Sequence, residues 1–242
     1  IATLRRRGVH IVDPEQGRLA GGDLGTGRLA APEAIVAAVR AALAAPDLEG
    51  LQVVVTAGGT REALDPVRYL GNRSSGRQGH AIAQAAAERG GDVTLVTAAG
   101  LATPPGVRRV DVESAQQMYD SVLALAAGAD IVVMAAAVAD FRPVVVCAKK
   151  LKKRDGVPTV QLEPTPDILA ALGATKRPGQ TIVGFAAETQ DVATNALDKL
   201  ARKGADLIVA NDVSAPGVGF EHETNQVTVL GADGHRVEIP LG

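Results

Sequence analysis

Short unbroken apolar runs alternate with longer amphipathic stretches over most of this chain. Continuous apolar runs bounded by glycine are typical of strands that are buried on both faces. Such runs stand at 51–57 (LQVVVTA), 92–98, 129–137, 181–188 and 206–212, with a shorter strand expected at 107–112. Helical patterns stand between them at 76–91, 114–128, 166–172 and 192–204. The alternation predicts an α/β fold with a Rossmann-like, mostly parallel sheet and helices on both faces.

The two ends of the chain follow different patterns. At the start we expect a strand at 9–12 (VHIV), a glycine-rich loop at 17–30 and a helix from Pro32, because proline suits a first helical turn. At the end, alternation over 225–240 around an Asp-Gly pair at 233–234 predicts a β-hairpin.

Residues 46–50 have the composition of a linker, so we expect two units, 1–45 and 51–242. The chain begins with Ile1 in place of Met, which suggests a piece of a longer protein.

Composition excludes several classes of function. A net charge of −2, with three Phe, two Tyr and no Trp, argues against a nucleic-acid partner. No apolar run approaches the roughly 18 residues of a membrane helix, so no membrane partner is expected. The lone Cys147 fits a reducing compartment, and we expect a cytoplasmic protein.

Candidate binding residues follow the first strand, where parallel sheets place their ligands. Gly58 and Gly59 let backbone approach a ligand, and NRSSGRQG (72–79) opens a helix. Ser74, Ser75 and Gly76 are therefore expected to offer amide donors and the positive end of the helix dipole to a phosphate. The alternative is that Ser75 only caps the helix.

Two further strand ends carry polar or aromatic candidates. Asp140 follows the run at 129–137 and suits a ribose hydroxyl or a magnesium ion, or else a turn cap. Thr165 is expected to cap a helix whose first turn holds Pro166. Phe185 follows another buried strand and offers a flat surface to a base, although a core role is the alternative.

Lysines are concentrated in one loop, AKKLKKRDG at 148–156. It holds Lys149, Lys150, Lys152 and Lys153, which are four of the seven lysines in the chain. A mobile loop of ammonium groups beside a phosphate site can close over a triphosphate and neutralise developing charge. A solvated charged loop is the alternative.

Common nucleotide and metal fingerprints are missing. The first strand is not followed by G-x-G-x-x-G, the chain has no G-x-x-x-x-G-K-[ST], and its four histidines are dispersed.

In order, TAGGTREALDPVRYLGNRSSGRQG, AAVADFRP, KLKK (150–153), TPDIL, VGFAAET and DLIVANDVS resemble bacterial phosphopantothenate–cysteine ligases over residues 51–240. That family usually forms the C-terminal half of a bifunctional coenzyme A biosynthesis protein. The resemblance implies that CTP activates 4′-phosphopantothenate to an acyl cytidylate with loss of pyrophosphate, and that L-cysteine then displaces CMP. It also implies Mg²⁺ and a homodimer.

The resemblance assigns roles to residues. Asn72 would lie near the acyl cytidylate, where its amide would polarise the carbonyl, and Lys150 would contact CTP and assist its reaction. CTP would be bound by Met134, Ala135, Ala136, Asp140, Lys150, Pro166, Asp167, Ile168, Leu169, Phe185, Lys199 and Lys203. Simple βαβ geometry, however, places Lys199 and Lys203 too far along their helix, and a surface role is the alternative for both.

Residues 1–45 resemble the tail of the partner flavin-dependent phosphopantothenoylcysteine decarboxylase domain. Gly21 stands where many relatives have a cysteine, and the flavin-binding portion is missing, so we expect no decarboxylation. Two other functions stay open: an NADPH-dependent oxidoreductase on a similar sheet, and a nucleic-acid-binding module that uses the lysine loop.

Overall fold

A computed structural model of the protein describes residues 1–19, 21–43, 45–188, 192–212 and 225–240. Its centre is an eight-stranded sheet in the order β14-β13-β12-β11-β8-β3-β6-β7. The six parallel strands are β3 (Gln52–Ala57), β6 (Asp92–Thr97), β7 (Arg108–Asp111), β8 (Ile131–Met134), β11 (Thr181–Glu188) and β12 (Leu207–Asp212). β13 (Val227–Gly231) and β14 (Arg236–Ile239) form the expected hairpin and run antiparallel. The predicted Rossmann-like sheet is confirmed.

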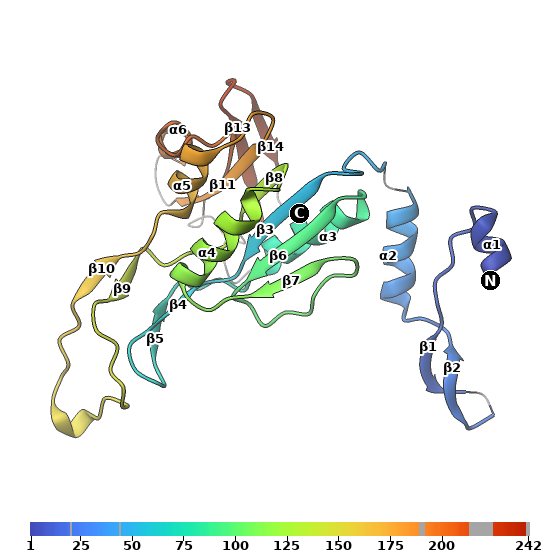
Figure 1. The fold of residues 1–242 in the computed structure, drawn as a ribbon, viewed down its shortest axis with the longest axis horizontal. Coiled ribbons are helices and arrows are strands. Elements are labelled where there is room, and N and C mark those ends of the chain that lie inside the picture. Colours follow the sequence, from blue (N-terminus) through green and yellow to red (C-terminus); the bar gives the residue numbers. More distant parts are fainter. Residues whose placement is uncertain (20, 44, 189–191, 213–224, 241–242) are drawn as a thin grey trace.

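Helices cover both faces of the sheet, because its central strands are apolar on both sides (Figure 1). On one face, Val54 and Val132 pack with α4 (Ala115–Ala126), α5 (Ile168–Thr175) and α6 (Val192–Lys203). On the other, Val55 and Leu95 pack with α3 (Arg77–Glu88). The helices therefore leave one edge of the sheet for a ligand, at the carboxyl ends of the parallel strands.

Two short antiparallel pairs were not predicted. β4 (Arg61–Ala63) pairs with β5 (Tyr69–Gly71), and β9 (Phe141–Pro143) pairs with β10 (Leu162–Pro164). We call residues 141–164 the arm. Figure 1 shows the arm leaving the body of the molecule at the lower left, beside β4 and β5, with the lysine loop toward its tip.

The N-terminal predictions are partly wrong. Residues 9–12 form no strand, since Val9 and Val12 are exposed and have no strand beside them to pair with. The glycine-rich stretch is mostly a hairpin of β1 (Glu15–Arg18) and β2 (Leu24–Arg28), after a short helix α1 (Ala2–Arg6). Helix α2 (Pro32–Leu43) begins at Pro32 as predicted.

The predicted start of the helix near Thr165 is also wrong. Asp167 is the N-cap of α5, because its side chain accepts a hydrogen bond from Ala170 N, so Pro166 precedes the helix. Thr165 instead donates its hydroxyl to the carbonyl oxygen of Ala139, 2.5 Å away.

Parts of two quoted motifs, Thr189 of VGFAAET and residues 213–214 of DLIVANDVS, lie outside the described residues. Over the ranges that are described, none of the helices combines the length and the apolar character needed to cross a membrane.

Candidate functional site

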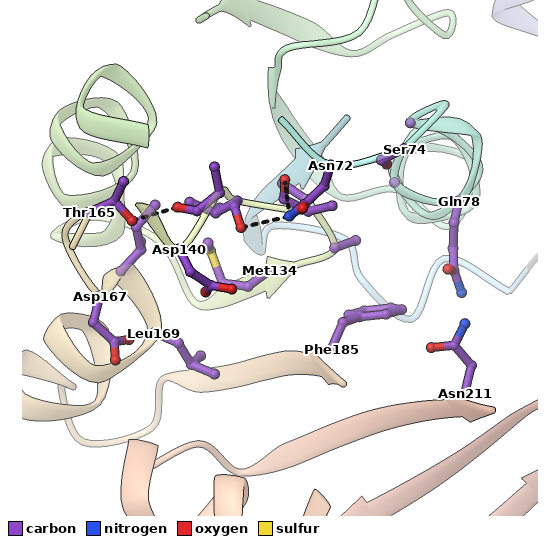
Figure 2. A pocket seen from close by; sticks show the side chains of 18 of the residues that line it. Asn72, Ser74, Gln78, Met134, Asp140, Thr165, Asp167, Leu169, Phe185 and Asn211 are labelled. Carbon is purple, nitrogen blue, oxygen red and sulfur yellow. Dashed lines mark hydrogen bonds between the residues drawn. The ribbon is translucent and has the colours of Figure 1, made fainter. Parts of the chain in front are cut away.

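A cavity of about 760 Å³ opens at the carboxyl edge of the sheet. Its wall is built from the loop after β8, the starts of α3 and α5, one side of α6 and the ends of β11 and β12 (Figure 2). The cavity gathers candidates that are far apart in the sequence: Asn72, Ser74, Ser75, Gly76, Met134, Ala135, Ala136, Asp140, Pro166, Asp167, Ile168, Leu169, Phe185, Lys199 and Lys203.

Three other candidates do not line this cavity: Gly58, Gly59 and Lys150. The two glycines allow close contact within the chain. A Cβ at Gly58 would lie 2.7 Å from Ala99 N, and one at Gly59 would lie 2.6 Å from Asn72 O.

The backbone at the start of α3 lines the cavity. Its N-cap is Gly76, in a left-handed conformation with φ of 79°, and no side chain caps the helix there. The Ser75 hydroxyl accepts only a long hydrogen bond, 3.4 Å, from Arg77 N. A helix start with open amides favours an anion, which is the physical basis of the predicted phosphate contact.

Buried hydroxyl groups hold the loop after β8 in place. Thr56 Oγ1 accepts from Ala136 N at 3.0 Å, and Thr60 Oγ1 accepts from Ala139 N at 2.9 Å. Both threonines are fully buried. They set the course of the loop that ends at the exposed Asp140. Sequence reasoning missed them, although a threonine inside or just after a buried strand is a usable signal of such a bond.

Asn72 is also bound to this loop. Its side-chain Nδ2 donates to Val138 O at 3.0 Å and to Ala137 O at 3.4 Å (Figure 2). Its Oδ1 is therefore the atom left to meet a ligand. For the Asn72 amide N–H to polarise the carbonyl of the acyl cytidylate, as expected from the resemblance, it would first have to break its bonds to Ala137 O and Val138 O.

The lysines of α6 reach the cavity, so the βαβ expectation for them is wrong. Lys203 forms an ion pair with Asp167, and Lys199 Nζ donates to Phe185 O at 2.7 Å. The reason is a close contact between α5 and α6, where a Cβ at Gly173 would lie 1.9 Å from Lys203 O. This contact packs the end of α6 against α5, and the Lys203 side chain then reaches Asp167 at the start of α5.

The pKa of the Asp167 carboxyl lies below its ordinary value. Partial burial raises this pKa, but hydrogen bonds from the Lys203 ammonium and from Ala170 N outweigh that effect, with further help from the charge of Lys199. The carboxylate is thus ionised at neutral pH.

Three amide side chains that sequence reasoning missed also line the cavity: Gln78, Asn211 and Asn225. Figure 2 shows Gln78 and Asn211 facing one another beside Phe185. Asn225 Oδ1 is buried and has no hydrogen-bond partner among the described residues. Gln78 and Asn211 stand inside the quoted motifs GRQG and DLIVAND, which was the available signal.

Lys150 is exposed on the lysine loop of the arm. Its neighbour Leu151 is held by the turn between β4 and β5, through hydrogen bonds with Asp65 and Arg68. The single chain therefore places Lys150 outside its own cavity, and the contact with a nucleotide stays a prediction.

The sheet and cavity together define a Rossmann-like α/β protein whose cavity lies at the carboxyl edge of the parallel strands, where open α/β sheets generally bind ligands. Residues 48–242 match the family described as DNA/pantothenate metabolism flavoprotein C-terminal domain. The chain belongs to this family, in agreement with the resemblance seen in the motifs.

Similar proteins cover the whole chain. It is 49% identical over 259 residues to the Coenzyme A biosynthesis bifunctional protein CoaBC of Mycobacterium tuberculosis, and 46% identical over 246 residues to that of Bacillus subtilis. The chain spans 62% and 60% of their lengths. A crystal structure of the C-terminal domain of a CoaBC is 41% identical, with a TM-score of 0.67, covering 80% of this chain and 87% of that one.

We predict that Asp167→Asn lowers stability at neutral pH and that the difference from wild type disappears in acid. Asparagine keeps an oxygen for the Ala170 N–H but loses the charge that Lys203 binds. The pKa of Asp167 is lower in the folded chain than in the unfolded chain, so its ionised form adds to the free energy of unfolding. This contribution is fully present above the unfolded-state pKa of about 3.9, and it is lost as the pH falls through the folded-state pKa. Urea unfolding from about pH 7 down to about pH 3 measures this. A difference that persists undiminished in acid would contradict the assignment.

Proposed function

We propose that this chain joins 4′-phosphopantothenate to L-cysteine at the expense of CTP in coenzyme A biosynthesis, giving phosphopantothenoylcysteine, CMP and pyrophosphate. The observation that carries the proposal is the convergence of most of the ligase motifs on one cavity. The name of the relatives, Coenzyme A biosynthesis bifunctional protein, supports the pathway.

The chemistry suits a site that binds anions, because neither step needs a side-chain nucleophile. The carboxylate oxygen of phosphopantothenate attacks the α-phosphorus of CTP, and pyrophosphate leaves. The cysteine amine then attacks the acyl carbon of the mixed anhydride, loses a proton, and CMP leaves. Both steps depend on positioning and on stabilising negative charge, which backbone amides and ammonium groups supply.

Different parts of the cavity wall would contact different parts of CTP. Lys199 and Lys203 bring positive charge, and the amides of Ser75 and Gly76 bring donors for a phosphate of either substrate, whereas Ser74 N already donates to Asn72 O at 2.9 Å. Phe185 offers a flat apolar surface beside the amides of Gln78 and Asn211. Backbone at 134–136 and 166–169 completes the wall.

Mg²⁺ fits this site as a partner of the triphosphate. Among the described residues there is no cluster of three side chains able to cage a metal, and Asp140 alone presents a carboxylate from the loop after β8. Magnesium is usually held by one or two carboxylates together with substrate phosphates. Asp140 would hold it there, and the ion would neutralise phosphate charge.

The arm supports the proposed homodimer. Many of its apolar side chains, with two from the β4–β5 hairpin, are exposed: Val67, Tyr69, Phe141, Val144, Val145, Val146, Val157 and Leu162. Apolar patches of this kind on a projecting element are typical of protein interfaces. Because Lys150 does not line its own cavity, we propose that the arm carries it to the cavity of a second copy.

Residues 1–45 are proposed to complete a preceding decarboxylase domain in the full-length protein. The relatives align with these residues as well as with the rest. Helix α2 exposes Val36, Val39 and Leu43, which another unit would cover.

The proposed reaction predicts pyrophosphate release only when phosphopantothenate and a nucleoside triphosphate are both present. We expect CTP to support release and ATP, GTP and UTP to fail, with amide formation on addition of cysteine. A pyrophosphate assay with each of the four nucleotides measures this. Release that needs no phosphopantothenate, or reduction of a substrate by NADPH, would reject the ligase.

Two substitutions should separate the two steps. Lys150→Gln removes a charge from the phosphates and should lower pyrophosphate release by about 10²-fold or more with the fold intact. Asn72→Asp should still release pyrophosphate but stall before amide formation, because a carboxylate oxygen would face the carbonyls of Ala137 and Val138. Pyrophosphate release with and without cysteine, and circular dichroism, measure both effects. Normal turnover by either variant contradicts its assigned role.

The proposed crossing of the arm predicts complementation in a dimer, whose mass should be twice 24.7 kDa by sedimentation. A chain with Lys150→Gln still has an intact cavity, and a chain with Asp140→Asn still has an intact lysine loop. After random exchange, mixed dimers should restore about a quarter of wild-type activity, since half are mixed and each has one complete site. Lys150→Gln mixed with a chain that carries both changes should stay inactive. No recovery in the first mixture would place Lys150 in its own cavity.

A further inference from the structure

Asp65 is a buried carboxylate for which the proposed chemistry has no use. It lies in the turn between β4 and β5, with its side chain fully buried, and it does not line the cavity. A charge is kept away from water only where hydrogen bonds or an opposite charge compensate for its lost hydration. The partners of Asp65 therefore indicate what its burial achieves.

The carboxylate joins its own turn to the lysine loop. Oδ1 accepts from Val67 N and from Arg68 N, both at 2.8 Å, which is a local turn. Oδ2 accepts from Leu151 N at 3.1 Å, 86 residues farther along the chain. A local turn explains the first two bonds but not the third.

Leu151 is held on both sides of its peptide backbone. While its N–H donates to Asp65, its carbonyl oxygen accepts from Arg68 Nη2 at 2.5 Å. A second attachment follows the same path, since Cys147 N donates to Leu64 O at 3.0 Å. The β4–β5 turn thus grips the arm at two points, one of them next to Lys150.

The exposed fractions of the loop residues agree with a backbone that hydrogen bonds fix in place and with lysine side chains that point away from it. Leu151 is half-buried, whereas Lys150 and Lys152 on either side of it are exposed. The backbone of the loop is fixed where the Lys150 side chain begins, and its ammonium points into solvent or toward a partner. Hydrogen bonds from three backbone N–H groups also outweigh the effect of burial and hold the pKa of Asp65 below its ordinary value, so the anchor is an anion at neutral pH.

We infer that Asp65 is a positioning residue that fixes the place of Lys150 by anchoring Leu151 to the β4–β5 turn. The catalytic consequence rests on the proposed function of Lys150. Because β5 leads directly into Asn72, one hairpin sets the position of both residues proposed to act in the two steps.

Asp65→Asn tests the anchor. Asparagine has the same shape as aspartate but no charge. One of the two carboxylate oxygens becomes an NH₂ group, which is a donor and cannot accept a hydrogen bond from a backbone N–H. Trypsin cleaves after lysine and arginine, which stand at 149, 150, 152, 153 and 154. We expect cleavage at these bonds to speed up by roughly tenfold, because proteolysis follows local opening. Turnover should fall, with little change in the KM for phosphopantothenate.

Leu151→Pro tests the same bond from the other side. Proline removes the N–H that Asp65 accepts and leaves the β4–β5 turn unchanged. It should reproduce the loss of turnover, and the double variant should be little worse than either single variant, as expected for two changes to one interaction. Asp47→Asn is the matched control, since its carboxylate pairs with Arg89 on the surface and both side chains are about half exposed. It should change neither cleavage nor turnover.

Failure of the anchor and failure of the proposed function give different results. If Asp65→Asn folds but is cleaved and turns over like wild type, the anchor is wrong. A loss of turnover without faster cleavage in the loop also overturns it. If cleavage speeds up but the wild-type chain has no ligase activity, the anchor stands and the proposed function falls. Lys150→Gln should lose turnover while its remaining loop bonds are cut at the wild-type rate.

Discussion

The site depends on how the backbone leaves strand β8. Residues 135–140 form neither helix nor strand, so their polar groups need partners from elsewhere. Hydroxyls of Thr56 and Thr60 supply acceptors from the neighbouring strand and the turn that follows it. The hydroxyl of Thr165 and the amide of Asn72 supply donors. These bonds join three separate segments around one loop, and both the cavity wall and the root of the arm follow from them.

Positive groups are distributed between rigid and projecting parts of the molecule. The amides at the start of α3 and the lysines of α6 belong to elements packed on the sheet, so their positions relative to the cavity are set. The lysine loop belongs to the arm, which the β4–β5 turn holds away from the body. A polyanionic substrate suits this division, because the packed groups would bind it on one side and the lysines of a second copy's arm would reach it from outside.

Much of the architecture could be predicted because its signals are local. The five continuous apolar runs and the shorter strand expected at 107–112 became the six parallel strands, and the long helical patterns became α2 to α6 with only their ends displaced. The hairpin β4–β5 and the pair β9–β10 were missed because each strand has three residues, too few to show a period. The strand expected at 9–12 is absent although its local apolar pattern is clear. An apolar run forms a strand only where another strand can pair with it.

For the site, the sequence by itself determined which candidate residues the chain offers to a ligand: the helix start at 74–76, Asn72, Asp140, Phe185 and the clustered lysines. Tertiary structure decided which of them meet. The contact of α5 with α6 at Gly173 brought Lys203 to Asp167, and the anchor at Asp65 held Lys150 out on the arm. Residue type and spacing along one strand or helix are local properties that a chain displays before it folds. The distance between two elements depends on how their surfaces pack, and only the folded molecule contains that information.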